Sequence, residues 1–242
     1  MSTASIIIIG DEILSNKFQD ENTPYLLEQC AKRHIKVLSV CIIPDDLQRI
    51  AQTLQDELQR SQYIFTTGGV GPTHDDKTFE GIALGLNRPL FRHPVLAAKL
   101  EKYLTKITED TYRMATVPEG TILLPTTRNY PQVMVPTENG NEIYIFPGVP
   151  KLLKEKFEAI ADRLQGKIIF RKKLGFEIFE SDIATELRQI QEDYPLVSIG
   201  SYPRFHEHPS LILTVESSNE ALCEDCSLKL KQAFQTFFVG MM

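Results

Sequence analysis

Residues 66–78 read TTGGVGPTHDDKT, and this stretch decides how the chain is organised. It follows the apolar residues 63–65, which predict a short buried strand, and it precedes residues 79–84, which predict the start of a helix. Three glycines after a strand allow the backbone to turn sharply and to approach a ligand closely. The stretch therefore predicts a strand, a tight turn and a helix in succession, with a ligand site at the turn.

The same stretch contains two kinds of group that can take part in binding a phosphate. Thr73 and Asp76 have the spacing of a helix capping box, and free amides at a helix start suit a phosphate group. Asp75 and Asp76 suit a hard divalent cation that would bridge to that phosphate. The alternative is an ordinary capped helix whose turn is solvated by these two acids. The stretch lacks the Gly-Lys-Ser/Thr of a Walker loop and the third glycine of the dinucleotide fingerprint.

Composition and charge narrow the class of protein. The chain has 242 residues, of which 42% are hydrophobic, as in a globular protein with one large domain or two small ones. A net charge of -6 disfavours nucleic acid as a partner, and an acidic protein that handles phosphate needs local positive groups or a metal. The longest aliphatic run, residues 6–9, is too short for a membrane span, and the N-terminus lacks the features of a secretory signal. We expect a cytoplasmic protein without membrane contact.

Acidic residues follow three successive strands that alternate with helices. Residues 4–9, 35–43 and 63–65 predict strands, and helices are predicted to start near Asn22 and Leu47. Such βαβ units form parallel sheets that bind ligands beyond the C-terminal strand ends. The acids at those ends are Asp11, Glu12, Asp45, Asp46, Asp75 and Asp76. Asp46 also fits the cap of its helix. We expect a metal or basic groups to neutralise this cluster.

The rest of the chain predicts a second wall of the pocket and a second domain. A helix is predicted over residues 94–107 and another over 151–164, and strands over 122–124, 132–135 and 142–146. Pro147 and Gly148 form a second turn after a strand, either as a pocket wall or as a rigid connector. Residues 165–167 predict a boundary between an α/β domain, residues 1–166, and a small α+β unit, residues 167–242, of order β-α-β-β-α.

Two further motifs in the second unit carry little chemistry. Cys223 and Cys226 form a C-x-x-C pair inside a predicted helix, where zinc or redox chemistry is disfavoured, and all four cysteines fit reduced thiols. His206-Glu207-His208 is too closely spaced for a helical zinc pair and predicts a solvated turn.

Several linked stretches resemble one known family. They are TTGGVGPTHDDKTFEGIA, IIIIGDEILS from Ile6, Asp20-Glu21-Asn22, Pro44-Asp45-Asp46, RMATVPEGTILL from Arg113, YPQVMV from Tyr130, YIFPGVPKLLKEKF from Tyr144 and ESDIATELRQIQEDYPLVSIGSYP from Glu180. Together they resemble the MoaB/Mog-like molybdopterin-binding domain family, in the subgroup at the N-terminus of CinA proteins and FAD synthases. The resemblance implies a three-layer α/β/α domain with a mainly parallel sheet, followed by a small KH-like α+β subdomain.

The chain departs from this family in three ways. Asn16 stands where bacterial members usually have a glycine, so the first loop is expected to differ in shape. Residues 168–235 lack the Gly-x-x-Gly loop of an RNA-binding KH module, so we do not expect RNA binding. The 242 residues contain neither the amide-hydrolysing domain of CinA relatives nor the adenylyl-transferring domain of FAD synthases. We therefore expect this chain alone neither to make FAD nor to deamidate pyridine nucleotides.

The resemblance implies metal-dependent hydrolysis of a nucleotide pyrophosphate such as FAD or ADP-ribose. The amides of Gly68, Gly69, Gly71 and Thr73 are expected to hold a phosphate, with Pro72, Asn22, Pro147 and Gly148 as further nucleotide-binding residues. Asp11, Asp75 and Asp76 are the predicted metal ligands, for Mg or Co with potassium as a further candidate. Asp76, Asp45 and Glu12 are the predicted catalytic residues, and either Glu12 or Asp45 fits a general base. Lys77 or Lys17 fits a group that stabilises the leaving charge, although a solvated lysine is the commoner case.

Two other functions fit the same residues. The loop can bind a nucleotide or a pterin without cleaving it, or transfer an adenylyl group in molybdenum-cofactor assembly. The chain can also be a scaffold with a vestigial site, acting through its oligomeric surface. We expect a homo-oligomer, either a dimer or a trimer.

Overall fold

The computed structural model describes residues 2–126 and 130–242. The chain divides into two compact units, of which the first ends at Gly166 and the second is Lys167–Met242.

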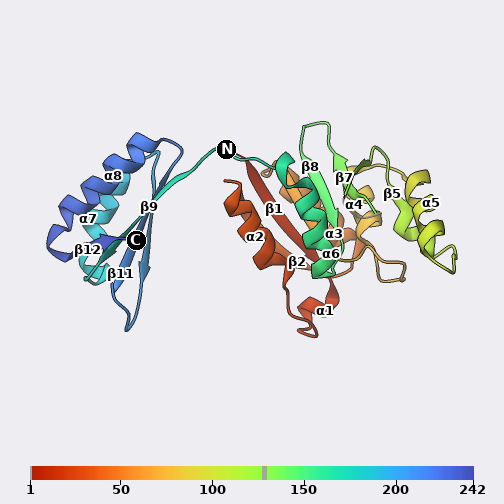
Figure 1. The fold of residues 1–242 in the computed structure, drawn as a ribbon, viewed down its shortest axis with the longest axis horizontal. Helices are drawn as coiled ribbons and strands as arrows, with labels where there is room; N and C mark the ends of the chain where they lie inside the picture. Colours follow the sequence, from red (N-terminus) through yellow and green to blue (C-terminus); the bar gives the residue numbers. More distant parts are fainter. Residues whose placement is uncertain (1, 127–129) are drawn as a thin grey trace. The chain divides into compact units, whose positions relative to one another are not determined.

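The first unit is built on a six-stranded sheet of order β2-β1-β3-β8-β7-β6 (Figure 1). Strands β2, β1, β3 and β8 are parallel, whereas β7 and β6 are antiparallel to their neighbours. The bounds are β1 Thr3–Ile9, β2 Lys36–Ile43, β3 Tyr63–Thr67, β6 Ile122–Leu124, β7 Gln132–Pro136 and β8 Glu142–Phe146. The predicted mainly parallel sheet is confirmed.

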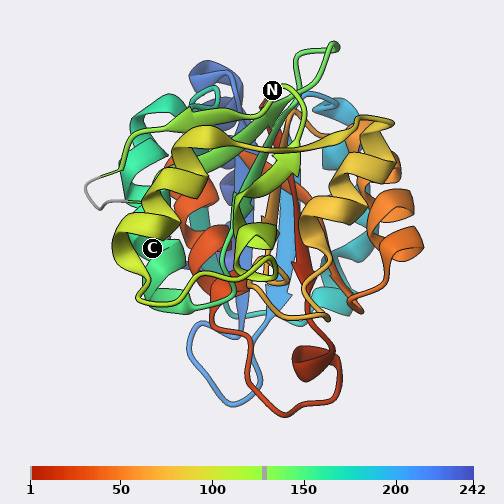
Figure 2. The same cartoon turned by 90° about the vertical axis from the view of Figure 1, so that its right-hand side faces the viewer.

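Helices cover both faces of this sheet, because its central strands carry apolar side chains on both sides. Ile6 and Ile8 of β1 pack in a core with α2 (Asn22–Lys32) and α6 (Pro150–Ile160). Ile7 and Ile9 pack on the other face, and the helices there are α3 (Leu47–Leu58), α4 (Thr78–Leu86) and α5 (Pro94–Tyr103). Figure 2 shows α3 and α4 across the sheet from α6. This alternation along one strand produces the expected three layers.

Some local details differ from the sequence predictions. Helix α5 ends at Tyr103 instead of residue 107, because Leu104 is already extended. A short helix, α1 (Asp11–Leu14), directly follows β1. A small antiparallel pair, β4 (Leu90–Arg92) with β5 (Thr116–Pro118), was not predicted, because two three-residue strands carry almost no periodic signal. Asp46 is the cap of α3, since its side chain accepts a hydrogen bond from the Arg49 N–H.

The second unit is a four-stranded antiparallel sheet of order β10-β11-β9-β12 with two helices. Its elements are β9 Phe170–Phe176, α7 Glu180–Asp193, β10 Ser198–Pro203, β11 Leu211–Ser217, α8 Glu220–Ala233 and β12 Phe238–Met241. The predicted β-α-β-β-α order is confirmed, and β12 is an addition to it. Cys223 and Cys226 are free, buried thiols of α8, and burial raises the pKa of Cys226 to about 11.

Among residues 2–126 and 130–242, no helix combines the length and the apolar character that a bilayer crossing requires.

Candidate functional site

A cavity of about 580 Å³ lies at the C-terminal ends of β1 and β3 and beside the turn after β8. Its polar wall brings together acids that follow three different strands. Eight of the residues singled out in the sequence line it: Glu12, Asn22, Asp45, Gly68, Gly69, Asp75, Asp76 and Gly148. We call it the acidic cavity.

Other predicted residues lie outside this lining. Asp11 contributes its backbone, since its N–H donates to Asp45 Oδ2 at 3.1 Å while its side chain is exposed. Pro147 faces a neighbouring apolar cavity, and Gly71 borders a small pocket of about 90 Å³. The structure also places Pro72, Thr73, Lys17 and Lys77 outside the lining of the acidic cavity, with Lys17 fully on the surface.

The glycine turn after β3 is close to neighbouring backbone, as its sequence predicts. Gly68 has φ 98°, and a Cβ there would lie 2.0 Å from the carbonyl oxygen of Ile9. Gly69 has φ 59°, and a Cβ there would lie 2.5 Å from Thr78 Oγ1 and 2.9 Å from Asp45 Oδ1. Only glycine combines these angles with such close approaches.

The amides of the loop are arranged differently from the predicted phosphate cradle. The Gly68 N–H donates to the Phe146 carbonyl at 3.2 Å. Those of Gly71 and Thr73 donate to Asp76 Oδ1 and Oδ2 at 2.7 and 2.9 Å. Three of the four predicted donors are thus engaged within the protein in this conformation, and their assignment to a phosphate stays a prediction. Within the described chain, the Gly69 N–H has no acceptor and remains as a donor.

Asp76 lines the acidic cavity and also closes the loop. Besides the two amides, the Thr73 hydroxyl donates to Asp76 Oδ2, so both carboxylate oxygens have partners within the loop. The capping-box prediction is wrong, because helix α4 begins at Thr78 and the Thr73–Asp76 pair forms a turn before it. These bonds make Asp76 a residue that positions the loop, and its predicted catalytic and metal-binding roles stay predictions.

Arg113 supports this loop and was not predicted as part of the site. Its Nη2 donates to the Asp76 carbonyl at 2.7 Å and lies 3.1 Å from Glu80 Oε1. Arg113 lies 37 residues from Asp76 in the sequence, and no spacing rule connects the two.

Asp45 is the acid of the cavity whose pKa is raised. Burial raises the pKa of this half-buried carboxyl, and the nearby carboxylates of Glu12, Asp11 and Asp75 raise it further, against the Asp11 N–H bond that lowers it. Asp75 is exposed, and the polar side chain of Thr73 beside it lowers its pKa. The like charges around Asp45 favour binding of a cation, which would remove their mutual repulsion.

These donors fit a magnesium-like ion and do not form a closed metal cage. Among the described residues, no three His, Cys, Asp or Glu side chains converge closely enough to hold a metal by themselves. Mg²⁺ is commonly held by one or two carboxylates, with water and substrate phosphate as its other ligands. Asp45 with Asp75 or Glu12 matches that pattern.

Asn22 contributes an unpaired acceptor to the same wall. Its Nδ2 donates to Gly148 O at 2.7 Å and to Thr67 Oγ1 at 3.0 Å, and the carbonyl partner fixes the amide orientation. Asn22 is 7% exposed, and its Oδ1 has no partner among the described residues. A buried acceptor of this kind marks a place where a water molecule or a ligand donor completes the site.

Asp20 also belongs to this region and was not predicted individually. Its side chain accepts hydrogen bonds from the backbone N–H groups of Asn22 and Thr23, so these two donors at the start of α2 are already engaged.

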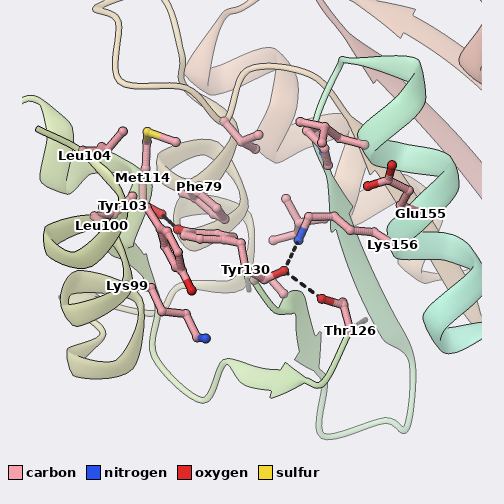
Figure 3. A pocket seen from close by; sticks show the side chains of 15 residues that line it. Phe79, Lys99, Leu100, Tyr103, Leu104, Met114, Thr126, Tyr130, Glu155 and Lys156 are labelled. Carbon is pink, nitrogen blue, oxygen red and sulfur yellow. Dashed lines mark hydrogen bonds between the residues drawn. The ribbon is translucent and has the colours of Figure 1, made fainter. Parts of the chain in front are cut away.

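A second cavity of about 430 Å³, the apolar cavity, borders β7, β8, α5 and α6 (Figure 3). Its lining includes Val70, Phe79, Leu100, Met114, Tyr130, Ile145 and Lys156. Burial lowers the pKa of Lys156 to about 8, and its Nζ donates to the carbonyls of Tyr130 and Pro131 at 3.2 and 2.6 Å. The sequence does not distinguish Lys156 from Lys151 and Lys154, which are exposed on the same helix.

Two family models match the two units. The model described as "Probable molybdopterin binding domain" matches residues 5–166, and the one described as "FAD synthase, middle domain" matches residues 168–240.

Individual relatives agree with these matches. A protein of Archaeoglobus fulgidus is 33% identical over 203 residues, which cover 82% of this chain and 85% of that protein. A probable FAD synthase of Caenorhabditis elegans is 29% identical over 258 residues, covering 95% of this chain and 49% of the relative. The chain thus spans about half the length of that FAD synthase.

A solved structure shares the fold of the first unit. The crystal structure of the protein CinA from Thermoplasma acidophilum superposes with a TM-score of 0.62 at 26% identity, covering 67% of this chain and 98% of the other. Because the first family model matches residues 5–166, well over half of the sequence, this chain belongs to the family of molybdopterin-binding domains, in the branch that carries an FAD synthase middle domain.

Proposed function

We propose that this chain is a metal-dependent pyrophosphatase that hydrolyses a dinucleotide or nucleotide sugar, such as FAD or ADP-ribose. The observation that carries the proposal is the acidic cavity, where Glu12, Asp45 and Asp75 gather beside the bare backbone of Gly68 and Gly69. An acidic wall repels a pyrophosphate unless a cation joins them, so the site suits phosphate together with a divalent metal. Such a metal would neutralise the pyrophosphate and lower the pKa of a water molecule.

The residues of the cavity have separable roles in this proposal. The Gly69 amide and the Asn22 side chain orient the ligand, and Asp45 with Asp75 holds the cation. Glu12 is the base that accepts a proton from the attacking water, because Asp45 is engaged with the Asp11 N–H at 3.1 Å. Asp76 holds the loop in shape through its three hydrogen bonds. Hydrolysis of the anhydride then yields two phosphomonoesters, one of which is AMP for both substrates.

The test measures AMP release from FAD and from ADP-ribose with magnesium or cobalt, against a chelated control. We expect Glu12→Gln to lower kcat by about 10²–10⁴-fold, the usual range for a proton-transfer group. Asp45→Asn should also lower AMP release, because it removes a carboxylate that holds the cation. Asp46→Asn is the matched control, because Asn also caps α3 and Asp46 does not line the cavity. Absence of AMP above the chelated control would refute the pyrophosphatase.

A second candidate is a nucleotide- or pterin-binding protein, or an adenylyltransferase, without hydrolase activity. It is favoured by the engagement of both Asp76 oxygens within the loop. Equilibrium binding of FAD or ADP-ribose without turnover would support it. In that case Asp45→Asn should strengthen binding in the presence of a chelator, because it removes a negative charge near the phosphates. Three expectations from the sequence stay predictions: that the metal is magnesium or cobalt, that potassium is a further cofactor, and that the chain forms a homo-oligomer.

A further inference from the structure

Strand β2 is an outer strand of the six-stranded sheet. After a register shift near its start, its pairing with β1 is regular over residues 39–43, and within the described chain no strand pairs with its other side. The Gly10 N–H donates to the Ile43 carbonyl at 3.1 Å, so the backbone of Ile43 faces β1. Because backbone groups alternate in direction along a strand, those of Val40 and Ile42 point away from β1 and have no strand to bond to.

The exposed side chains at this edge are apolar. Val40 and Ile42 are 40% and 43% exposed, and they pair in register with Ile6 and Ile8 of β1, so they extend from the same face of the sheet. Residues 37–43 contain neither a charged residue nor a proline. A strand edge of this composition readily pairs with another strand.

The other outer strands of the two larger sheets are protected against such pairing. β6 has three residues, and β12 has four with an irregular register. In β10 the Ile199 N–H donates to the Gln191 side chain at 2.9 Å, and Pro203 has no N–H to offer. Short edges, covering side chains and prolines are usual protections of an edge strand. Over its regular segment, β2 has none of them, which indicates that its edge is an interaction surface.

A second copy of this chain fits this edge in one antiparallel register. With a twofold axis at Cys41, Val40 of each copy lies opposite Ile42 of the other. Each of these two pairs can exchange two backbone hydrogen bonds, which satisfies the outward groups of the regular segment. The same register brings Lys36, at the start of one strand, towards the two acids that follow the other strand at residues 45–46. Apolar side chains, backbone groups and charges are therefore all complementary to a second copy.

We propose that strand β2 is the surface through which two copies of this chain associate, by antiparallel pairing of residues 39–43 about a twofold axis at Cys41. The two six-stranded sheets then form one continuous sheet, and the side chains of Val40 and Ile42 leave water. Asp45 follows β2 by two residues, so the pairing also holds the segment that leads into the acidic cavity. One short strand pair is a small interface, so the dimer is weak, with a Kd on the order of 10 μM.

Sedimentation velocity of the whole chain tests the proposal, at protein concentrations from about 1 to about 300 μM. We expect the wild type to reach the mass of a dimer over this range. Val40→Lys and Ile42→Asp each place a charge against an apolar side chain, and each should raise the Kd of the dimer by about tenfold or more. Leu84→Lys is the matched control, since Leu84 is 46% exposed on α4 and takes no part in the sheet. It should change the Kd by less than about twofold. Thermal unfolding of each variant shows that it is folded.

Mixtures of variants test the register. Val40→Lys and Ile42→Asp lie opposite each other in a mixed dimer, so their mixture should restore the dimer mass through an ion pair. Val40→Lys mixed with Val40→Asp should not, because residue 40 lies opposite residue 42 and not opposite itself. Three results would overturn the proposal: a wild type that stays monomeric up to about 300 μM, a dimer that Val40→Lys leaves intact, or a dimer restored by the second mixture and not by the first.

Discussion

The two cavities at the sheet edge are built by opposite means. The acidic cavity is shaped by backbone, through glycines with positive φ, and its charges are carboxylates crowded around Asp45. The apolar cavity is shaped by side chains, and its lining carries the amine of Lys156, with a pKa lowered to about 8, next to the carboxylate of Glu155. Each arrangement costs stability, by like-charge repulsion in one and by desolvation in the other.

The difference indicates what each cavity binds. Crowded carboxylates are relieved by a cation, whereas a desolvated lysine is relieved by an acceptor or an anion. Substitutions that disturb one cavity at a time can therefore separate their contributions.

The largest effect is expected from Gly68→Ala. The new Cβ would collide with the Ile9 carbonyl at 2.0 Å, on a backbone with φ 98°. Because the clash is with a central strand, we expect a loss of about 3–5 kcal/mol in the free energy of unfolding and loss of ligand binding in the acidic cavity. Urea denaturation measures the first and calorimetry the second.

Gly140→Ala is the control for this prediction. Gly140 has a similar φ of 83°, but a Cβ there meets nothing within 4 Å. It should lose only ~1 kcal/mol from the unfavourable φ. Equal losses in the two variants would show that the close approach of β3 to β1 does not constrain the turn.

Asp76→Asn should have the next largest effect. An amide offers only one oxygen acceptor, so the Gly71 and Thr73 N–H groups can no longer both be satisfied. We expect a loss of about 1–3 kcal/mol in unfolding free energy and a fall of about 10- to 100-fold in AMP release, measured by urea denaturation and by kinetics.

The pH profile distinguishes positioning from proton transfer at Asp76. If Asp76 only shapes the loop, kcat falls without a shift of the acidic limb of the profile. Loss of that limb would identify Asp76 as the base. Asp75→Asn provides the stability control, because Asp75 is exposed and should change the unfolding free energy by less than ~0.5 kcal/mol.

The features of the fold and of the acidic cavity that depend on local sequence patterns could be predicted from the sequence. The apolar run of β1 with acids after it, the glycines after β3 and the cap at Asp46 are all encoded within a few residues. These patterns gave the parallel sheet and the position of the acidic cavity. The boundary at residues 165–167 and the strand-helix order after it were also local patterns, and the resemblance to one family added the KH-like description of the second unit.

The parts that sequence missed depend on contacts between distant residues. Whether Asp76 faces a ligand or its own loop depends on the conformation of that loop, which Arg113 supports from outside it. Lys156 differs from Lys151 only in what surrounds it, namely the Tyr130 and Pro131 carbonyls that follow the undescribed residues 127–129. No spacing in the sequence reveals such burial.

Lys156→Met should change how stability depends on pH. The pKa of Lys156 is about 8 in the folded chain against an ordinary 10.5, so the unfolded chain binds more protons between these values. The free energy of unfolding of the wild type therefore gains a contribution on the order of 1–2 kcal/mol as pH rises from about 7.5 to about 9.5. The variant should lack this contribution.

Urea denaturation at the two pH values measures this difference, with Lys151→Met as the control. Other groups that titrate in this range contribute equally to the variant and the wild type and cancel in the comparison. An identical pH dependence in wild type and Lys156→Met would show that the amine of Lys156 is solvated in the folded chain.

The smallest effect, and the one of opposite sign, is expected for Asp45→Asn. The raised pKa of Asp45 means that its ionised form is disfavoured in the fold, and that at neutral pH the charge lowers stability relative to a neutral group. Asparagine keeps an oxygen for the Asp11 N–H and removes the repulsion from Glu12 and Asp75. The melting temperature should therefore rise by about 2–4 °C even as AMP release is lost.

Magnesium should raise the melting temperature of the wild type and leave that of Asp45→Asn unchanged, because the cation relieves the repulsion that the substitution has already removed. A lower melting temperature for the variant without magnesium would mean that Asp45 is held by favourable contacts and not by the need for a cation.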